Sequence, residues 1–354
     1  MSRKISKWRR FNLSSMFRAV CLKLFFFIPV TILELFIKQK KVVIRGQVLD
    51  FQSSIFLALQ PKGLMSKISA DAIPTVRDLI ENRKIKSRLS RTHPNQVEKI
   101  DHYIKDDERN TEFLLREYSP KTPSIDVSIL FIHGGGFVMD SVAVYDDMIS
   151  YFSGYLDATI YSLEYSLAPE HKYPVAILQA KTAYDWIHIN RDQRISICGD
   201  SAGGYLAASL TQLLIRKFDT KPHSQLLLYP TCGPRIESES MELFAEGFFL
   251  STKDLKWFWD HFIGSTNQKT SLSINLLESS IQEDLPATII VTAGFDPICD
   301  EGRNYAQLLK EKGVDTTLIH YPTLFHGFAF MSKLTTAYSA VNDFLRKYKA
   351  ILED

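Results

Sequence analysis

The sequence predicts an α/β fold in which a mostly parallel sheet is covered by helices on both faces. Short apolar runs alternate with segments of helical period through the last two thirds of the chain. The runs are apolar throughout, as in strands that are buried on both faces of a parallel sheet. The chain has 354 residues and is 45% hydrophobic, which is enough for a sizeable core.

Each element follows from this alternation. The expected strands are the apolar runs at 128–132, 158–163, 194–198, 225–229, 287–292 and 315–320. The expected helices lie at 175–190, 202–217, 251–262, 300–313 and 334–350. Two further helices are predicted between residues 49 and 90, the second capped by Ser69 or Asp71. The polar stretch 91–112 is expected to be a linker.

Charge is divided unevenly along the chain. Residues 1–45 hold eleven Lys or Arg and one acid, Glu34, which gives a net charge of +10. The rest of the chain holds 31 bases and 39 acids, a net charge of −8. Because the body is acidic, a nucleic-acid-binding function is not expected.

The N-terminal segment joins a basic start to a ten-residue apolar run, Leu24 to Leu33. A bilayer span needs about 20 residues, and no small-residue cleavage site of a signal peptide follows the run. Since bases flank the run on both sides, residues 1–44 are expected to attach to an anionic membrane surface. The alternative is an apolar arm that packs on the protein itself.

The cysteines are scattered and lack the spacing of a metal site: Cys21, Cys198, Cys232 and Cys299. This pattern favours free thiols in a reducing, cytoplasmic compartment. Disulfide pairing within the fold stays open, as does the formation of a homodimer.

Residues 199–203, Gly-Asp-Ser-Ala-Gly, stand between an expected strand and an expected helix. This is the pattern of a G-x-S-x-G nucleophile elbow. The turn is so sharp that it leaves no room for side chains two residues on either side of the serine. The hydroxyl then stands at a helix N-terminus, whose dipole favours developing negative charge. Ser201 is therefore the predicted nucleophile.

A serine nucleophile needs a base to remove its proton, and the base needs an acid to orient it. In elbow enzymes the acid and then the histidine follow the serine along the chain. Asp296 comes in the loop after the strand at 287–292, and His326 comes in the loop after the strand at 315–320. Both order and position predict these two residues as the partners of Ser201.

Other residues could take these two roles. Asp300 or Glu301 could supply the acid, but their position at a helix N-terminus explains them as charges that favour the helix dipole. His320 lies within a strand run and is expected to be structural, and His171 lies in a turn near a proline.

Three glycines, Gly134, Gly135 and Gly136, follow His133 at the end of the strand at 128–132. Glycine lets the backbone come close to a ligand and adopt positive φ. Ahead of a serine elbow, the run predicts backbone N–H groups that stabilise an oxyanion. His133 is expected to support that loop structurally.

Several spaced motifs resemble the hormone-sensitive-lipase family of α/β-hydrolases, which includes the bacterial family IV esterases. The matching stretches are HGGGF (133–137), YSLAPEHKYP (165–174), GDSAGG (199–204), GFFLSTKDLKWFWDHF (247–262), LPATIIVTAGFDPICDEG (285–302) and HGF (326–328). The two early helices look like that family's N-terminal cap. The resemblance implies cap helices and linker at 45–112 and an α/β-hydrolase domain at 113–354, with a cap insertion at about 234–263.

The resemblance also implies a catalytic triad of Ser201, Asp296 and His326 and no metal or organic cofactor. The implied oxyanion hole consists of the backbone N–H groups of Gly134, Gly135 and Ala202. The expected substrates are carboxylic esters with short to medium acyl chains, held in an apolar pocket predicted to include Phe137, Phe248 and Phe249.

The chain departs from the family pattern at two places near the glycines. Glu164-Tyr165-Ser166 stands where the family usually has Asp-Tyr-Arg, so a structural arginine contact is expected to be missing. Asp140 stands where a glycine is common and is expected to adopt positive φ, which aspartate tolerates better than most residues.

These patterns favour a serine carboxylesterase that works through an acyl-enzyme. The same chemistry could act on amides, as in arylacetamide deacetylases, whose N-terminal membrane anchor resembles the basic, apolar arm. A tethered lipase acting on bilayer lipids is a further alternative. A non-catalytic receptor, as in gibberellin-receptor-like proteins, is disfavoured because such receptors lack the histidine that His326 supplies.

Overall fold

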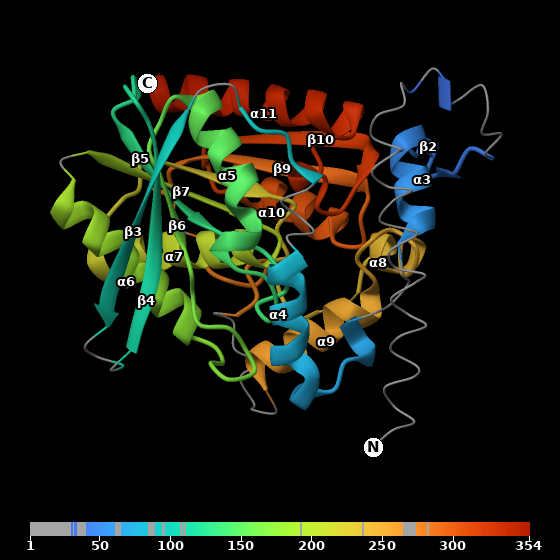
Figure 1. Ribbon diagram of the computed structural model, residues 1–354, viewed down its shortest axis with the longest axis horizontal. Coiled ribbons are helices and arrows are strands. Elements are labelled where there is room, and N and C mark those ends of the chain that lie inside the picture. The colour runs from blue at the N-terminus through green and yellow to red at the C-terminus, as the bar shows by residue number, and fades with distance from the viewer. Residues whose placement is uncertain are drawn as a thin grey trace.

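The computed structural model describes residues 30, 32–33, 40–60, 65–83, 89–93, 96–106, 109, 111–191, 193–235, 237–264, 274–281 and 283–354. An eight-stranded sheet forms the centre of the molecule (Figure 1). Its strand order is β10 (Thr316–Phe325), β9 (Ala287–Phe295), β8 (Ser224–Leu228), β7 (Arg194–Asp200), β5 (Val127–Ile132), β6 (Ile160–Leu163), β4 (Thr111–Pro120) and β3 (Val97–Asp106). The pairings from β10 to β6 are parallel, and β4 and β3 add antiparallel pairings at one edge.

The apolar runs of the sequence become the parallel strands. Every residue of β5, β6 and β8 is buried, as expected for strands covered on both faces. Each of these strands overlaps the predicted apolar run, and β9 and β10 continue beyond it to the loops that carry Asp296 and His326. The predicted fold class is therefore confirmed.

Helices cover both faces of the sheet. On one face, α6 (Val175–Asn190), α7 (Ala202–Phe218) and α10 (Cys299–Glu311) contribute to one apolar core. On the other face, α5 (Val142–Leu156) and α11 (Thr335–Glu353) contribute to a second core. The parallel strands have buried side chains in both cores, which is why their sequences lack a polar face.

A group of short helices lies together beside the sheet: α4 (Ile73–Arg83), α8 (Glu239–Leu243) and α9 (Thr252–Ile263) (Figure 1). The 3₁₀ turn η1 (Met65–Lys67) joins this group, because the Ser66 N–H donates to Asp254 Oδ1 of α9 at 2.7 Å. The predicted cap of the second helix was wrong. Ser69 precedes a separate 3₁₀ turn, η2 (Ala70–Ala72), without a side-chain capping bond, and Asp71 lies inside that turn.

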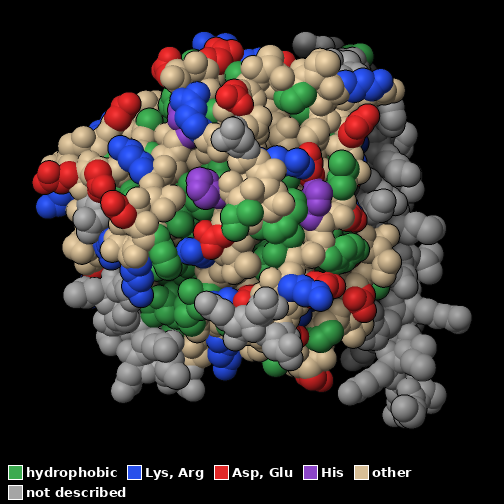
Figure 2. All heavy atoms as spheres, turned by 90° about the vertical axis from the view of Figure 1, so that its left-hand side faces the viewer, with side chains coloured by type: hydrophobic (Ala, Val, Ile, Leu, Met, Phe, Trp, Pro, Cys, Tyr) green, Lys and Arg blue, Asp and Glu red, His purple; other side chains and the backbone are tan. Residues whose placement is uncertain are grey.

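The linker predicted at 91–112 was also wrong, since β3 and the start of β4 lie within it. β3 is an edge strand whose residues are mostly exposed, so its sequence has the polar composition of a loop. Figure 2 shows this side of the molecule, where Lys and Arg side chains stand next to Asp and Glu side chains. Helix α5 was not predicted, because it is rich in β-branched and aromatic residues that are mediocre helix formers.

The first described elements are a small hairpin of β1 (Val43–Ile44) and β2 (Gln47–Val48), followed by α3 (Phe51–Leu59). The helix begins at Asp50, whose side chain accepts a hydrogen bond from the Ser53 N–H at 2.8 Å. Phe56 packs into the core that also contains residues of α11 and β10.

Of the apolar run at 24–33, which was predicted to attach to a membrane, seven of the ten residues lie outside the described residues. Within the part of the chain that the structure does describe, no helix is long and apolar enough to cross a bilayer.

Candidate active site

The turn between β7 and α7 holds Ser201 in a backbone conformation that serine rarely adopts, with φ 54° and ψ −118°. A Cβ on Gly199 would stand 2.2 Å from the Gly203 carbonyl oxygen, and a Cβ on Gly203 would stand 2.0 Å from the Ile132 carbonyl oxygen. The sequence argument that glycine is required on both sides of the serine is confirmed by these clashes.

The structure brings Ser201, His326 and Asp296 into one line of hydrogen bonds. Ser201 Oγ lies 2.9 Å from His326 Nε2, and His326 Nδ1 lies 2.8 Å from Asp296 Oδ2. Since a carboxylate only accepts hydrogen bonds, Nδ1 carries the proton and Nε2 is left to accept from the serine hydroxyl.

Burial and a second hydrogen bond hold the acid in place. Asp296 is fully buried, and its Oδ1 accepts the Ile298 N–H at 3.0 Å. The alternative acids bind elsewhere: Asp300 pairs with Arg45, and Glu301 accepts the Cys232 N–H at 2.8 Å. Of the three carboxylates considered, Asp296 is the one bonded to His326.

The glycine loop does not present Gly134 as predicted. Its N–H donates to Asp200 Oδ1 at 2.7 Å, so the prediction that Gly134 binds an oxyanion is wrong. Gly135 and Gly136 have φ of +99° and +64°, and within the described residues neither amide N–H has an acceptor. The Ala202 N–H, at the first position of α7, also lacks an intrahelical acceptor.

Asp200 links the elbow to the glycine loop. While Oδ1 accepts from Gly134, its Oδ2 accepts the Tyr145 hydroxyl at 3.0 Å. Burial beside the Asp200 carboxylate raises the pKa of Tyr145 well above its usual range, so the phenol remains a donor. The sequence predicted no role for Asp200, although a carboxylate directly before the predicted nucleophile was a signal that it contacts the site.

His133 lies under the same loop. Its Nδ1 contacts the Gly134 carbonyl oxygen at 2.8 Å, and its ring stacks on Tyr165 at a centroid distance of 4.4 Å. The Tyr165 hydroxyl in turn donates to the His133 carbonyl oxygen at 3.1 Å. These contacts agree with the structural role expected for His133.

The guanidinium of Arg77 hydrogen-bonds to the backbone that follows the glycines. Arg77 of α4 donates through Nε to the Val138 carbonyl oxygen at 2.6 Å and through Nη2 to the Ala168 carbonyl oxygen at 2.5 Å. It also pairs with Glu170 at 2.9 Å. The segment around Ser166 was expected to lack an arginine contact, but α4 supplies one from a distant part of the sequence.

The structure shows the contacts and conformations of the residues near the glycines that depart from the family pattern. Asp140 has φ 74°, which confirms the expected positive φ. Glu164 accepts the Val142 N–H at 2.7 Å at the start of α5. Burial raises the pKa of Glu164 to about 7. The Ser166 N–H donates to Gln179 Oε1 at 2.8 Å.

The three predicted pocket residues do not form one cluster. Phe137 is buried and stacks on Phe262 of α9 at 4.0 Å. Phe248 packs on Phe295 at 5.6 Å. Phe249 is 40% exposed and lies within ring-contact distance of Phe325, directly before the histidine.

Phe258 of α9 lies directly against the glycine loop. A Cβ on Gly136 would stand 2.3 Å from the Phe258 ring. The sequence showed an aromatic helix here, which is more often core, and its spacing alone gave no reason to single out this ring.

A second buried carboxyl lies near the acid. Glu301 accepts from the Cys232 N–H and from the Thr231 hydroxyl, and Trp259 Nε1 donates to that hydroxyl at 3.3 Å. Burial raises the pKa of Glu301 to about 8, so this group is largely protonated at neutral pH.

Among the described residues, no group of His, Cys, Asp and Glu side chains is arranged to hold a metal ion. Cys198, Cys232 and Cys299 are buried and free of disulfides, while Cys21 lies outside the described residues.

The fold and the elbow define this chain as an α/β-hydrolase. A family model described as alpha/beta hydrolase fold matches residues 129–330. The chain belongs to this family, whose members resemble hormone-sensitive lipase.

Two curated relatives illustrate the match. The carboxylic ester hydrolase LipN of Mycobacterium tuberculosis is 32% identical over 237 residues, which cover 63% of this chain and 62% of LipN. The match thus spans less than two thirds of LipN. The arylesterase of Saccharolobus solfataricus is 29% identical over 287 residues, which cover 78% of this chain and 85% of the relative.

Among solved structures, an ester hydrolase from the metagenome of Lake Arreo, bound to a bipyridine phosphonate derivative, is 28% identical with a TM-score of 0.77. That similarity covers 85% of this chain and 98% of the other.

Proposed function

We propose that the protein is a serine carboxylesterase that hydrolyses short- to medium-chain carboxylic esters through an acyl-enzyme. The observation that carries this proposal is the unbroken line from Ser201 Oγ to His326 and on to Asp296, at 2.9 and 2.8 Å. Two relatives, a carboxylic ester hydrolase and an arylesterase, support the same class of reaction.

In the first half of the reaction, Ser201 Oγ attacks the ester carbonyl carbon while His326 Nε2 takes the hydroxyl proton. Asp296 stabilises the imidazolium through the Nδ1–H bond. As the tetrahedral intermediate collapses, His326 returns the proton to the departing alkoxide, and the acyl group stays on the serine. Water then repeats these steps to release the acid and restore Ser201.

The oxyanion of each tetrahedral intermediate needs backbone donors. We assign this role to the N–H groups of Gly135, Gly136 and Ala202, because the N–H of Gly134 is already donated to Asp200. Ala202 supplies a donor at the start of α7, where the helix dipole also favours negative charge.

Hydrolysis of p-nitrophenyl esters of increasing chain length tests this proposal. Ser201→Ala should lose at least about 10³-fold in kcat, since the nucleophile is removed, whereas Ser339→Ala, an exposed serine on α11, should retain wild-type activity. A phosphonate should label Ser201, as mass spectrometry of the peptide would show. Equal activity in Ser201→Ala would end the proposal, and hydrolysis of matching anilides but not esters would shift it to amides.

We also propose that residues 1–44 attach the protein to an anionic membrane surface. The support is the concentration of eleven Lys or Arg residues in the first 45 positions, together with the apolar run at 24–33. Co-sedimentation with vesicles should require anionic lipid and should weaken as salt rises. Equal binding to neutral vesicles, or none to anionic ones, would contradict this assignment.

A further inference from the structure

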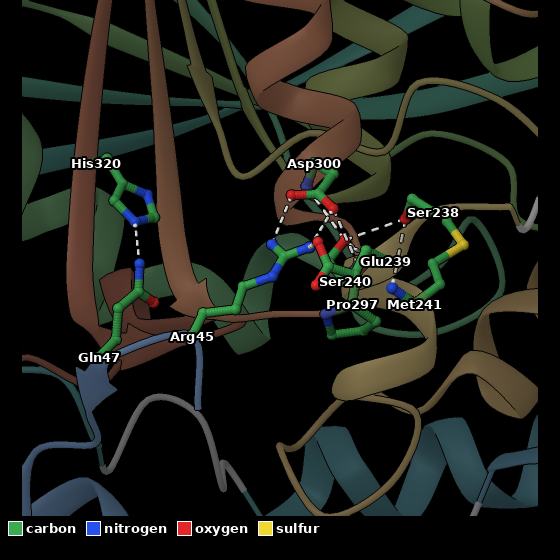
Figure 3. A network of polar contacts seen from close by, with 9 residues as sticks. All are labelled: Arg45, Gln47, Ser238, Glu239, Ser240, Met241, Pro297, Asp300 and His320. Atoms are coloured by element: carbon green, nitrogen blue, oxygen red, sulfur yellow. Dashed lines mark hydrogen bonds and ion pairs between the residues drawn. The ribbon is translucent and has the colours of Figure 1, made fainter. Parts of the chain in front are cut away.

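The first described part of the chain contacts both loops that carry the acid and the base. We call residues 42–60 the N-terminal unit; it comprises β1, β2 and α3. Its contacts reach residues more than 250 positions further along the chain. Figure 3 shows the polar part of this arrangement.

Arg45 makes the strongest of these contacts. It lies in the turn between β1 and β2 with φ 53°, and its Nη1 and Nη2 donate to Oδ1 and Oδ2 of Asp300, both at 2.8 Å. Nη2 also donates to Glu239 of α8 at 2.7 Å (Figure 3). Such bidentate pairs fix geometry as well as charge, and the guanidinium holds the pKa of Asp300 below its usual range.

Asp300 passes this restraint to the loop after the acid. Its Oδ2 accepts the Ser240 N–H at 2.9 Å, and its own N–H donates to Ser240 Oγ at 3.2 Å. Ser240 Oγ then donates to the Pro297 carbonyl oxygen at 2.7 Å. Because Pro297 directly follows Asp296, Arg45 is connected to the backbone of the acid through two side chains.

The same unit contacts the strand and loop that lead to the base. The Asp50 N–H donates to the Thr323 carbonyl oxygen at 2.9 Å, three residues before His326. One residue before His326, the ring of Phe325 stacks on Phe56 of α3 at 5.8 Å.

A half-buried histidine, His320, connects the N-terminal unit to both strands. Gln47 Nε2 lies 3.2 Å from His320 Nε2 (Figure 3). His320 Nδ1 lies 2.9 Å from Thr292 Oγ1. Burial lowers the pKa of His320, so its neutral ring can accept from the Gln47 amide. Gln47 therefore joins β10 and β9, the strands before the base and the acid.

We propose that the N-terminal unit braces the Asp296–His326 pair, and that Arg45 is a positioning residue that acts through Asp300. The inference rests on the proposed hydrolysis. It adds the requirement that contacts with the N-terminal unit hold Asp296 and His326 in position. The acid must hold the imidazole at the correct angle, and a displacement of about 1 Å can cost about 100-fold in rate.

Arg116 offers a matched control for Arg45. It forms a bidentate pair with Asp101 at 2.6 and 2.8 Å, and its side chain is 21% exposed against 19% for Arg45. It lies on β4, next to the edge strand β3 on the far side of the sheet from β10. Both substitutions to Gln therefore remove a similar ion pair, but only Arg45→Gln loosens the acid loop.

The experiment compares the full-length variants by kcat, KM, melting temperature and the downfield proton signal of the His326 Nδ1–H. Arg45→Gln should lower kcat about tenfold with little change in KM, and its imidazole proton signal should shift or broaden. Arg116→Gln should leave kcat and the signal as in the wild type. Arg45→Lys should recover part of kcat, because an ammonium keeps one of the two bonds to Asp300.

Asp300→Asn provides a second route if Arg45→Gln does not fold. It weakens the same pair and should cause a similar loss of kcat, and in the double variant the two losses should not add. Wild-type kcat with an unchanged signal in Arg45→Gln or Asp300→Asn would overturn the brace. An equal loss of kcat in Arg116→Gln would do so too. If the proposed serine mechanism is wrong, the result will differ from both of these: Ser201→Ala will keep wild-type activity.

Discussion

Replacing Gly135 by alanine tests the revised oxyanion loop most directly. The residue has φ +99°, and a Cβ there would stand 2.1 Å from the Met139 carbonyl oxygen. To restore an ordinary contact of 3.4 Å the loop would have to move by about 1.3 Å. A shift of about 1 Å can cost about 100-fold in rate, and loss of one oxyanion donor costs about 10²–10³ in kcat, or about 2.7–4 kcal/mol. We therefore expect Gly135→Ala to lose about 10²–10³ in kcat.

Gly313→Ala is the control for backbone strain. Its φ of +78° is also unfavourable for alanine, but a Cβ there would meet no atom within 4 Å. It should destabilise the fold by about 1 kcal/mol and keep wild-type kcat on the p-nitrophenyl ester that the wild type hydrolyses fastest. Urea unfolding of both variants separates lost stability from lost chemistry. If folded Gly135→Ala turns over within about threefold of the wild type, the loop does not supply the oxyanion donors.

Two more predictions concern groups next to the site. Arg77→Gln should lower kcat about tenfold, because the carbonyl oxygens of Val138 and Ala168 lose their guanidinium. Glu170→Gln removes only the partly exposed ion pair with Arg77, so its kcat should stay near that of the wild type. Equal losses of kcat in Arg77→Gln and Glu170→Gln would show that this ion pair, and not the bonds to the two carbonyl oxygens, matters for turnover. For Glu301, burial on folding raises the pKa of the carboxyl from its usual 4.5 to about 8, so between these two pH values the folded state binds more protons than the unfolded state. The free energy of unfolding should therefore fall as pH rises from 5 to 8, by up to about 4 kcal/mol. Glu301→Gln should remove that decline, and an unchanged pH slope in urea titrations would count against the buried carboxyl as its source.

The parallel half of the sheet could be predicted because burial on both faces leaves continuous apolar runs. Helix 175–190 was predicted at its observed bounds, since it carries a helical period. The β3–β4 hairpin could not be predicted in the same way. An edge strand that pairs on one side and faces solvent has no apolar face to reveal it.

The Ser201, Asp296 and His326 positions were predicted because chain order and loop position constrain them independently of side-chain contacts. The error at Gly134 has a different origin. Consecutive glycines are equivalent in sequence, and only the position of the Asp200 carboxylate, 2.7 Å from one amide, decides which N–H groups are free to bind an oxyanion. Arg77 and Arg45 escaped prediction because their partners lie 61 and 255 residues further along the chain.

The span between Arg45 and Asp300 also has a consequence during protein synthesis. At about 5–20 residues per second, a ribosome needs roughly 10–50 s to add the residues that separate them. Until then Arg45 lacks its bidentate partner, and His320, Thr323 and His326 are added later still. The Ser201, His326 and Asp296 line is therefore incomplete while the serine elbow is already made, and the segment from Asp296 to His326 both completes that line and packs against the N-terminal unit.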